Sequence, residues 1–129
     1  MNAPPQTSGR NNTPILQHLV RIYKFWHGFL PNLSQFARYT LGAKIDGALL
    51  ETIEAVLFAS FAAREKKLVY LERAAVKLDL VKFLMQVAWE VKALDNKKYV
   101  LISEELAGVG RMLGGWLKKY NQPPTAPKR

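Results

Sequence analysis

Residues 78–91, LDLVKFLMQVAWEV, decide the fold of this 129-residue chain. At about 100° per residue on a helical wheel, the polar side chains of this region collect on one stripe less than about 90° wide, and all others in the stretch are apolar. An outer bundle helix needs an apolar arc only a little over about 100° wide, and this arc is about twice that. The stretch predicts a helix that buries more than one face. Its polar stripe is formed by Glu72, Asp79, Lys82, Gln86 and Glu90.

Two arrangements explain this wide apolar arc. The helix either packs against its three neighbours within one bundle, or it packs against the core on one side and against another copy of the chain on the other. Because a large exposed apolar patch is a liability for a lone chain, we favour self-association. The predicted contact between copies comprises Leu80, Val81, Phe83, Leu84, Val87 and Val91.

The rest of the central chain shows three further helical segments and no strand alternation. Thr13 as N-cap and Pro14 at the first helical position begin the first helix, and Pro31 ends it. The second begins after Asn32 or Ser34 and fades near residue 63, before a charged turn at 64–67. The third spans about 67–94, and the fourth runs from about 96 to 120. The first helix has one apolar face, formed by Ile15, Leu19, Ile22, Trp26 and Phe29.

Short loops between long helices force neighbouring helices to lie antiparallel. The sequence therefore predicts an all-α fold, an up-down-up-down antiparallel four-helix bundle at residues 13–121. Residues 1–12 and 122–129 are rich in proline and polar residues and have little to bury, so we expect disordered tails.

The last helix carries four glycines, which cost about 4 kcal/mol together relative to alanine. Close approach of another backbone along a row of small residues would offset that cost, whereas a break at Gly114–Gly115 would remove it. The sequence leaves both explanations open. The apolar heptad of this helix comprises Tyr99, Ile102, Leu106, Val109, Leu113, Trp116 and Tyr120.

The net charge of +9 makes polyanions the first class of partner to consider. Most of the excess lies on the first and last segments, which neighbour each other in an antiparallel bundle. No groove-reading motif is present, so we expect nucleic-acid binding through phosphates, with steep salt dependence and little sequence preference. The predicted residues for nucleic acid or a partner are Arg21, Lys24, Arg38, Lys44, Lys82, Arg111, Lys118 and Lys119.

Catalytic chemistry is not indicated. The absence of cysteine excludes disulfides, thiol catalysis and a cysteine zinc site. His18 and His27 are too far apart along one helix to share a metal, and no Glu-x-x-His pair is present. We therefore expect no enzyme activity, metal or cofactor. With no membrane span and no signal segment, we expect a cytoplasmic protein.

Two segments resemble signatures of one known family. Residues 38–45, RYTLGAKI, follow Phe29-Leu30-Pro31 and are similar to the entry of the second helix in the accessory variability determinant (Avd) proteins of diversity-generating retroelements. Residues 109–117, VGRMLGGWL, are similar to the signature of that family's last helix, and Tyr99 at the head of this helix also fits.

This resemblance implies a four-helix bundle assembled into a homopentameric barrel with a basic surface. It also implies a non-catalytic subunit that binds the retroelement's reverse transcriptase and nucleic acid during mutagenic retrohoming. The family's arginine pair in the third helix corresponds here to Lys82 and Gln86, so only the first charge is kept. The alternative is a bundle protein of the 23S rRNA intervening-sequence type without a polymerase partner. A bundle lying on a membrane surface is less favoured, because the tryptophan and lysine residues do not gather into one lipid-facing helix with a basic flank.

Overall fold

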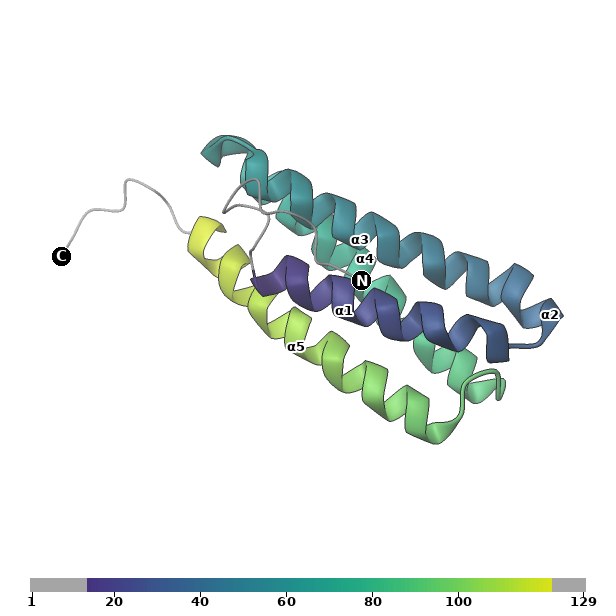
Figure 1. The fold of residues 1–129 in the computed structure, drawn as a ribbon. Coiled ribbons are helices and arrows are strands. Elements are labelled where there is room, and N and C mark those ends of the chain that lie inside the picture. The colour runs from purple at the N-terminus through teal and green to yellow at the C-terminus, as the bar shows by residue number, and fades with distance from the viewer. Residues whose placement is uncertain (1–13, 122–129) are drawn as a thin grey trace, which may run out of the picture.

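Four long helices build the computed structural model, which describes residues 14–121 (Figure 1). They are α1 (Pro14–Phe29), α3 (Ala43–Phe61), α4 (Arg64–Glu90) and α5 (Asn96–Asn121). A 3₁₀ turn (Leu30–Asn32), the single-turn α2 (Gln35–Ala37) and a π-helical turn (Arg38–Gly42) connect α1 to α3. No strand occurs in this part of the chain. Thr13 and both predicted tails lie outside the described residues.

Each long helix packs against two antiparallel neighbours. α1 contacts α3 and α5, and α4 also contacts α3 and α5, so α1 and α4 occupy opposite corners of the bundle. Figure 1 shows α1 beside α5, with α3 and α4 forming the other pair. The predicted four-helix bundle is confirmed, with up-down-up-down topology.

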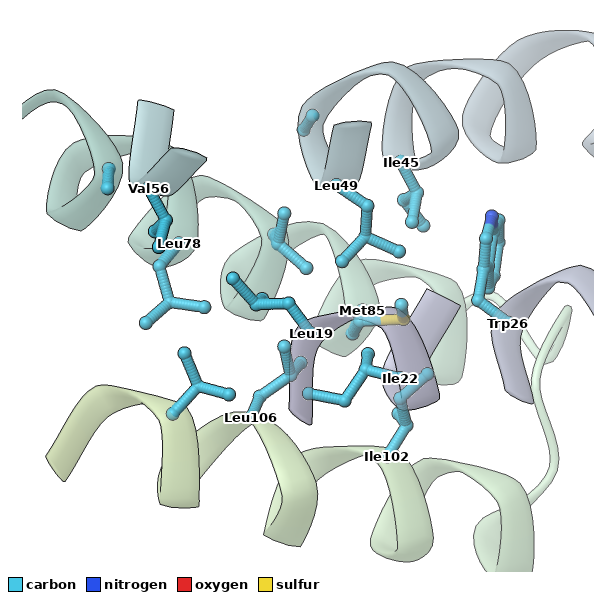
Figure 2. Packing of buried hydrophobic residues seen from close by; sticks show 14 of the residues in the cluster. Leu19, Ile22, Trp26, Ile45, Leu49, Val56, Leu78, Met85, Ile102 and Leu106 are labelled. Atoms are coloured by element: carbon cyan, nitrogen blue, oxygen red, sulfur yellow. The ribbon is translucent and has the colours of Figure 1, made fainter. Parts of the chain in front are cut away.

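Apolar side chains from all four long helices meet along the bundle axis (Figure 2). The predicted face of α1 supplies Leu19, Ile22 and Trp26, all essentially inaccessible to solvent. Four heptad positions of α5 are buried, and Tyr99, Trp116 and Tyr120 pack against the edge of the core. Each buried large apolar side chain contributes about 1.5–3 kcal/mol. This core is therefore the main source of the fold's stability.

The connection between α3 and α4 differs from the prediction. Arg64 already begins α4, and the break falls at Ala62 and Ala63, whose backbones are extended. The Lys67 ammonium donates to the carbonyl oxygens of Ala59 (2.7 Å) and Ser60 (3.4 Å). A cation at a helix C-terminus satisfies free carbonyls and the helix dipole. The charged residues thus belong to the first turn of α4, where Lys67 caps α3.

α4 ends four residues earlier than predicted. The N–H of Ala93 donates to the Ala88 carbonyl (2.8 Å) and the N–H of Lys92 donates to that of Trp89 (3.0 Å), as in a Schellman motif. Lys92 takes the left-handed conformation that this motif needs, with φ of 65°. A side chain in that conformation costs on the order of 1–2 kcal/mol. Lysine stands here in place of the usual glycine, so spacing alone predicts a helix that is too long.

The π-helical turn fits tightly against the 3₁₀ turn. A Cβ added to Gly42 would lie 3.2 Å from the carbonyl oxygen of Ala37 and 3.3 Å from Leu33 Cδ1. Ser34 caps the preceding turn by accepting from the N–H of Ala37 (3.1 Å), as one of the two predicted starts requires. A side chain at position 42 would therefore press on the preceding turn and on the Leu33 side chain, which accounts for the glycine of the RYTLG segment.

α5 runs unbroken through its four glycines to Asn121. A Cβ on Gly108 would lie 2.9 Å from His18 Cε1, and one on Gly110 would lie 3.0 Å from Lys82 Nζ. Both glycines therefore admit a side chain from a neighbouring helix. Gly114 and Gly115 have nothing within 4 Å of an added Cβ. The predicted approach of another backbone is not what Gly108 and Gly110 show, since the neighbouring atoms belong to side chains. No helix break accompanies the other two glycines.

Asp46 joins α1 to α3 at the edge of the core. Its Oδ1 accepts hydrogen bonds from the Tyr23 hydroxyl (2.8 Å) and from Trp26 Nε1 (3.2 Å). Burial, followed by the hydrogen bond to Asp46, raises the pKa of Tyr23. The carboxylate thus satisfies two donors of α1 where the helices meet.

We predict that Asp46→Ala lowers the free energy of unfolding by about 2 kcal/mol, because two partly buried donors lose their acceptor. Glu54→Ala on the exposed side of α3 is the control and should change it by less than about 0.5 kcal/mol. Urea unfolding followed by circular dichroism measures both. Equal effects of the two substitutions would contradict this role of Asp46.

Candidate nucleic-acid and partner surfaces

Basic side chains gather where α1 and α5 lie side by side. Together these helices carry seven lysines and arginines and two carboxylates, a net charge of +5. α3 and α4 carry seven of each and are neutral. We call the exposed surface of the first pair the α1/α5 face. Its predicted binding residues are all exposed: Arg21, Lys24, Arg111, Lys118 and Lys119.

Glu105 holds the two helices of this face together. Its Oε1 lies 2.6 Å from His18 Nε2 and 2.9 Å from Arg21 Nη2. Gly108, one turn further along α5, leaves room for the His18 ring. The helix α1 contains no acidic residue, so α5 supplies the carboxylate that partners its cations.

The contacts with Arg21 and His18 also change the pKa of the Glu105 carboxyl. The hydrogen bond from Arg21 holds the pKa of Glu105 below its ordinary value, with a smaller contribution from His18, although burial acts in the opposite direction. Glu105 therefore stays ionised in the folded chain at neutral pH. Arg21 is partly neutralised, whereas Lys24 and Arg111 have no acidic partner among the described residues.

The remaining three predicted basic residues lie elsewhere. Arg38 is half-buried in the π-helical turn, and its Nη2 donates to the Leu33 carbonyl (3.4 Å). It therefore stabilises the turn and does not belong to the α1/α5 face. Lys82 extends from α4 over Gly110, between α4 and α5. Lys44 lies at the start of α3, on the side of α4. The predicted set thus divides into one basic face and three separate positions.

The predicted contact residues on α4 are also divided. Val81 is fully buried in the core of the single chain, so it is not available to another copy. Leu80, Leu84 and Val87 are half-buried, whereas Phe83 is 60% exposed. Val76 and Val69 lie seven and fourteen residues before Phe83 and are also exposed. The outward stripe of α4 therefore keeps an apolar series of Val69, Val76 and Phe83.

One surface was not found by sequence reasoning. A groove of about 770 Å³ lies between the end of α4 and the segment from α2 to the start of α3. We call it the end groove. Phe36 on its wall is 80% exposed, and Val91 is 62% exposed. Its signal in the sequence was weak, because two separate loops meet there. The lining comprises Asn32, Ser34, Phe36, Ala37, Thr40, Leu41, Lys44, Val87, Val91, Lys92 and Ala93.

A protein-family model described as bAvd-like matches residues 15–120. The chain belongs to this family. The match spans the whole bundle, so the resemblance to Avd proteins is confirmed. No curated protein shows significant similarity to the chain. In the described part, none of the helices combines the length and apolarity needed to cross a bilayer, and no three acidic or histidine side chains are grouped to hold a metal ion.

The family signatures lie on the two surfaces described above. The RYTLG segment forms the π-helical turn, and its Thr40 and Leu41 line the end groove. A π-helical turn within an α-helix frequently marks a functional position. The VGRMLGGWL segment lies on α5 and places Arg111 on the α1/α5 face. Each signature therefore forms part of a helix or turn of the bundle and also places residues on one of the two surfaces.

We predict that Glu105 stabilises the fold at neutral pH and loses this effect in acid. Because its folded pKa is lowered, its contribution is present above the unfolded pKa of about 4.5 and is lost as the pH falls through the folded pKa. Glu105→Gln should lower the free energy of unfolding by about 1 kcal/mol at pH 7, and this deficit should shrink towards pH 3.

The adjacent Glu104→Gln is the matched control, since Glu104 is exposed and makes no ion pair in the described part of the chain. Thermal unfolding from pH 3 to pH 7 measures both variants. A pH-independent effect of Glu105→Gln would show that charge is not the cause.

Proposed function

We propose that this protein is a non-catalytic accessory subunit of a diversity-generating retroelement. It binds the reverse transcriptase of the same element, and it binds template RNA or cDNA through the α1/α5 face in support of mutagenic retrohoming. The observation that carries this proposal is the bAvd-like family match over residues 15–120. The separation of charge between the two helix pairs supports it, because a face with net charge +5 attracts phosphates.

The proposed active form is a homopentamer. Its subunit contact uses the outward apolar stripe of α4, which exposes Val69, Val76 and Phe83. The same side of α4 also carries three carboxylates, spaced between these apolar residues: Glu65, Glu72 and Asp79. We propose that this stripe meets a different surface of the next subunit. Such a head-to-tail contact forms a closed ring when the rotation permits.

A bundle of the 23S rRNA intervening-sequence type remains the alternative. It predicts no association with a polymerase and a gene placed within an rRNA gene. Co-purification with the neighbouring reverse transcriptase, where its gene lies beside template and variable repeats, tests the proposed function directly. A stable oligomer that binds neither the polymerase nor its template RNA would refute it.

We predict that Arg111→Glu combined with Lys118→Glu weakens binding of the template RNA by about tenfold or more at 0.1 M salt. Each lost phosphate contact should also reduce the slope of log Kd against log salt by about 1. Fluorescence anisotropy at several salt concentrations measures both effects.

Lys66→Glu combined with Arg73→Glu on α4 is the control, because it changes the net charge equally on the other helix pair. It should affect RNA binding less. If the two double variants weaken binding equally, net charge and not the α1/α5 face is responsible.

We also predict that light scattering gives the native mass of five 14.6-kDa chains and that Phe83→Asp lowers it. The substitution places a charge in the proposed apolar contact, where it would lose its hydration. Leu50→Asp on α3, at a side chain of similar exposure (47%), is the control and should leave the mass unchanged. A single-chain mass for the wild type would contradict the pentamer.

A further inference from the structure

We infer that the end groove binds an acidic segment of a partner protein that carries an apolar stripe, such as one amphipathic helix. This inference rests on the proposed function, in which the partner protein is the reverse transcriptase. It separates protein docking at the end groove from nucleic-acid binding at the α1/α5 face.

The lining of the groove favours an apolar anchor. Leu41, Val87 and Val91 come from two elements and form its wall with Phe36. A phenylalanine side chain that is 80% exposed gains a large apolar contact when a partner covers it. A volume of about 770 Å³ admits several side chains from one face of a helix.

The charge of the groove favours carboxylates in the partner. Lys44 and Lys92 are its charged lining residues, and neither ammonium has an acceptor among the described residues. On the other side of Lys92, Glu90 accepts from Gln86 (3.0 Å) and Asp95 accepts from Lys98 (3.2 Å). The ammonium groups of Lys44 and Lys92 are therefore available to pair with carboxylates of an incoming segment.

Lys92 adds an independent argument. It occupies the left-handed position of the motif that ends α4, where glycine is the favoured residue. The backbone there gains nothing from a lysine, so the free chain would be no less stable with glycine. A cation held at the rim in a disfavoured conformation indicates that its side chain has a use, as strained residues at binding sites do.

Other occupants fit less well. The chain's own segments 1–13 and 122–129 contain no acidic residue, so they do not complement Lys44 and Lys92. Phe36 is the single aromatic residue among the aliphatic side chains of the lining, so the groove offers a nucleic acid one surface for base stacking. The α1/α5 face carries more cations. A second copy could present the acidic and apolar stripe of α4, and the native mass tests this occupant.

The test uses the full chain and the retroelement's own reverse transcriptase. We expect Phe36→Ala to weaken polymerase binding about tenfold or more, as truncation of a central anchor does. Lys92→Gly should weaken it about threefold to fivefold, with a larger loss at low salt, while its Tm stays equal or rises. A variant that folds at least as well and binds less cannot owe its defect to unfolding.

Phe61→Ala is the matched control, because Phe61 is an exposed phenylalanine at the opposite end of α3 (51%). It should leave polymerase binding unchanged. RNA binding and native mass should be unchanged in all three variants.

Each contrary result has a distinct meaning. Polymerase binding unaffected by Phe36→Ala and Lys92→Gly overturns the inference and leaves the proposed function standing. A fall in native mass assigns the groove to a contact between copies, and a selective fall in RNA affinity assigns it to nucleic acid; both also overturn the inference. If the wild-type chain does not bind the polymerase, the proposed function fails and the inference fails with it.

Discussion

The contact of Glu105 with His18 and Arg21 underlies the distribution of charge in this bundle. Antiparallel topology places α1, which has no carboxylate, beside the lysine-rich α5. Repulsion between exposed cations is screened over about 8–10 Å at ordinary salt, so burial of the core outweighs it. Glu105 relieves the repulsion at its contact with His18 and Arg21. It neutralises the cluster locally and leaves Lys24 and Arg111 to face solvent.

Two lysines stabilise helix ends in this chain, Lys67 through its side chain and Lys92 through its backbone conformation. Lys67 donates to the last carbonyls of α3, and Lys92 takes the left-handed position after α4. The helix α4 lies between the end of α3 and the left-handed Lys92, and it is 27 residues long. Its length brings Val87 and Val91 level with α2, so the end groove depends on where α4 stops. The Lys67 side chain therefore bears on the end of α3, whereas the Lys92 side chain lies at the rim of the end groove.

Much of the fold could be predicted, because helical periodicity reports directly on burial. The apolar face of α1 and the heptad of α5 were identified from spacing alone. Four of the five predicted α1 positions and four of the seven heptad positions are buried, and the others pack at the edge of the core. The C-terminal limit of α4 was displaced because a lysine at a left-handed position has no local signal. The π-helical turn was missed for a related reason, since its close packing around Gly42 depends on contacts with the preceding turn.

The candidate surfaces were predictable only in part. Summing charge by segment located the α1/α5 face, because neighbouring helices in the bundle follow from the short loops. The Glu105 cluster joins residues more than 80 positions apart, which no spacing rule reveals. Arg38 was predicted to be a surface cation, but its guanidinium donates to the backbone carbonyl of Leu33. The wide apolar arc of α4 was correctly described, yet α3 covers part of it, and Phe83 and Val91 are left on different surfaces.

The positions of the two surfaces bear on how one small subunit serves two partners. The α1/α5 face follows the long side of the bundle, whereas the end groove lies where α2, α3 and the end of α4 meet (Figure 1). A polyanion held along one side would not cover an apolar groove at the end. In the proposed function, the subunit can therefore hold nucleic acid and polymerase at once. The proposed accessory subunit would then act by proximity, because binding both partners raises the effective concentration of one near the other.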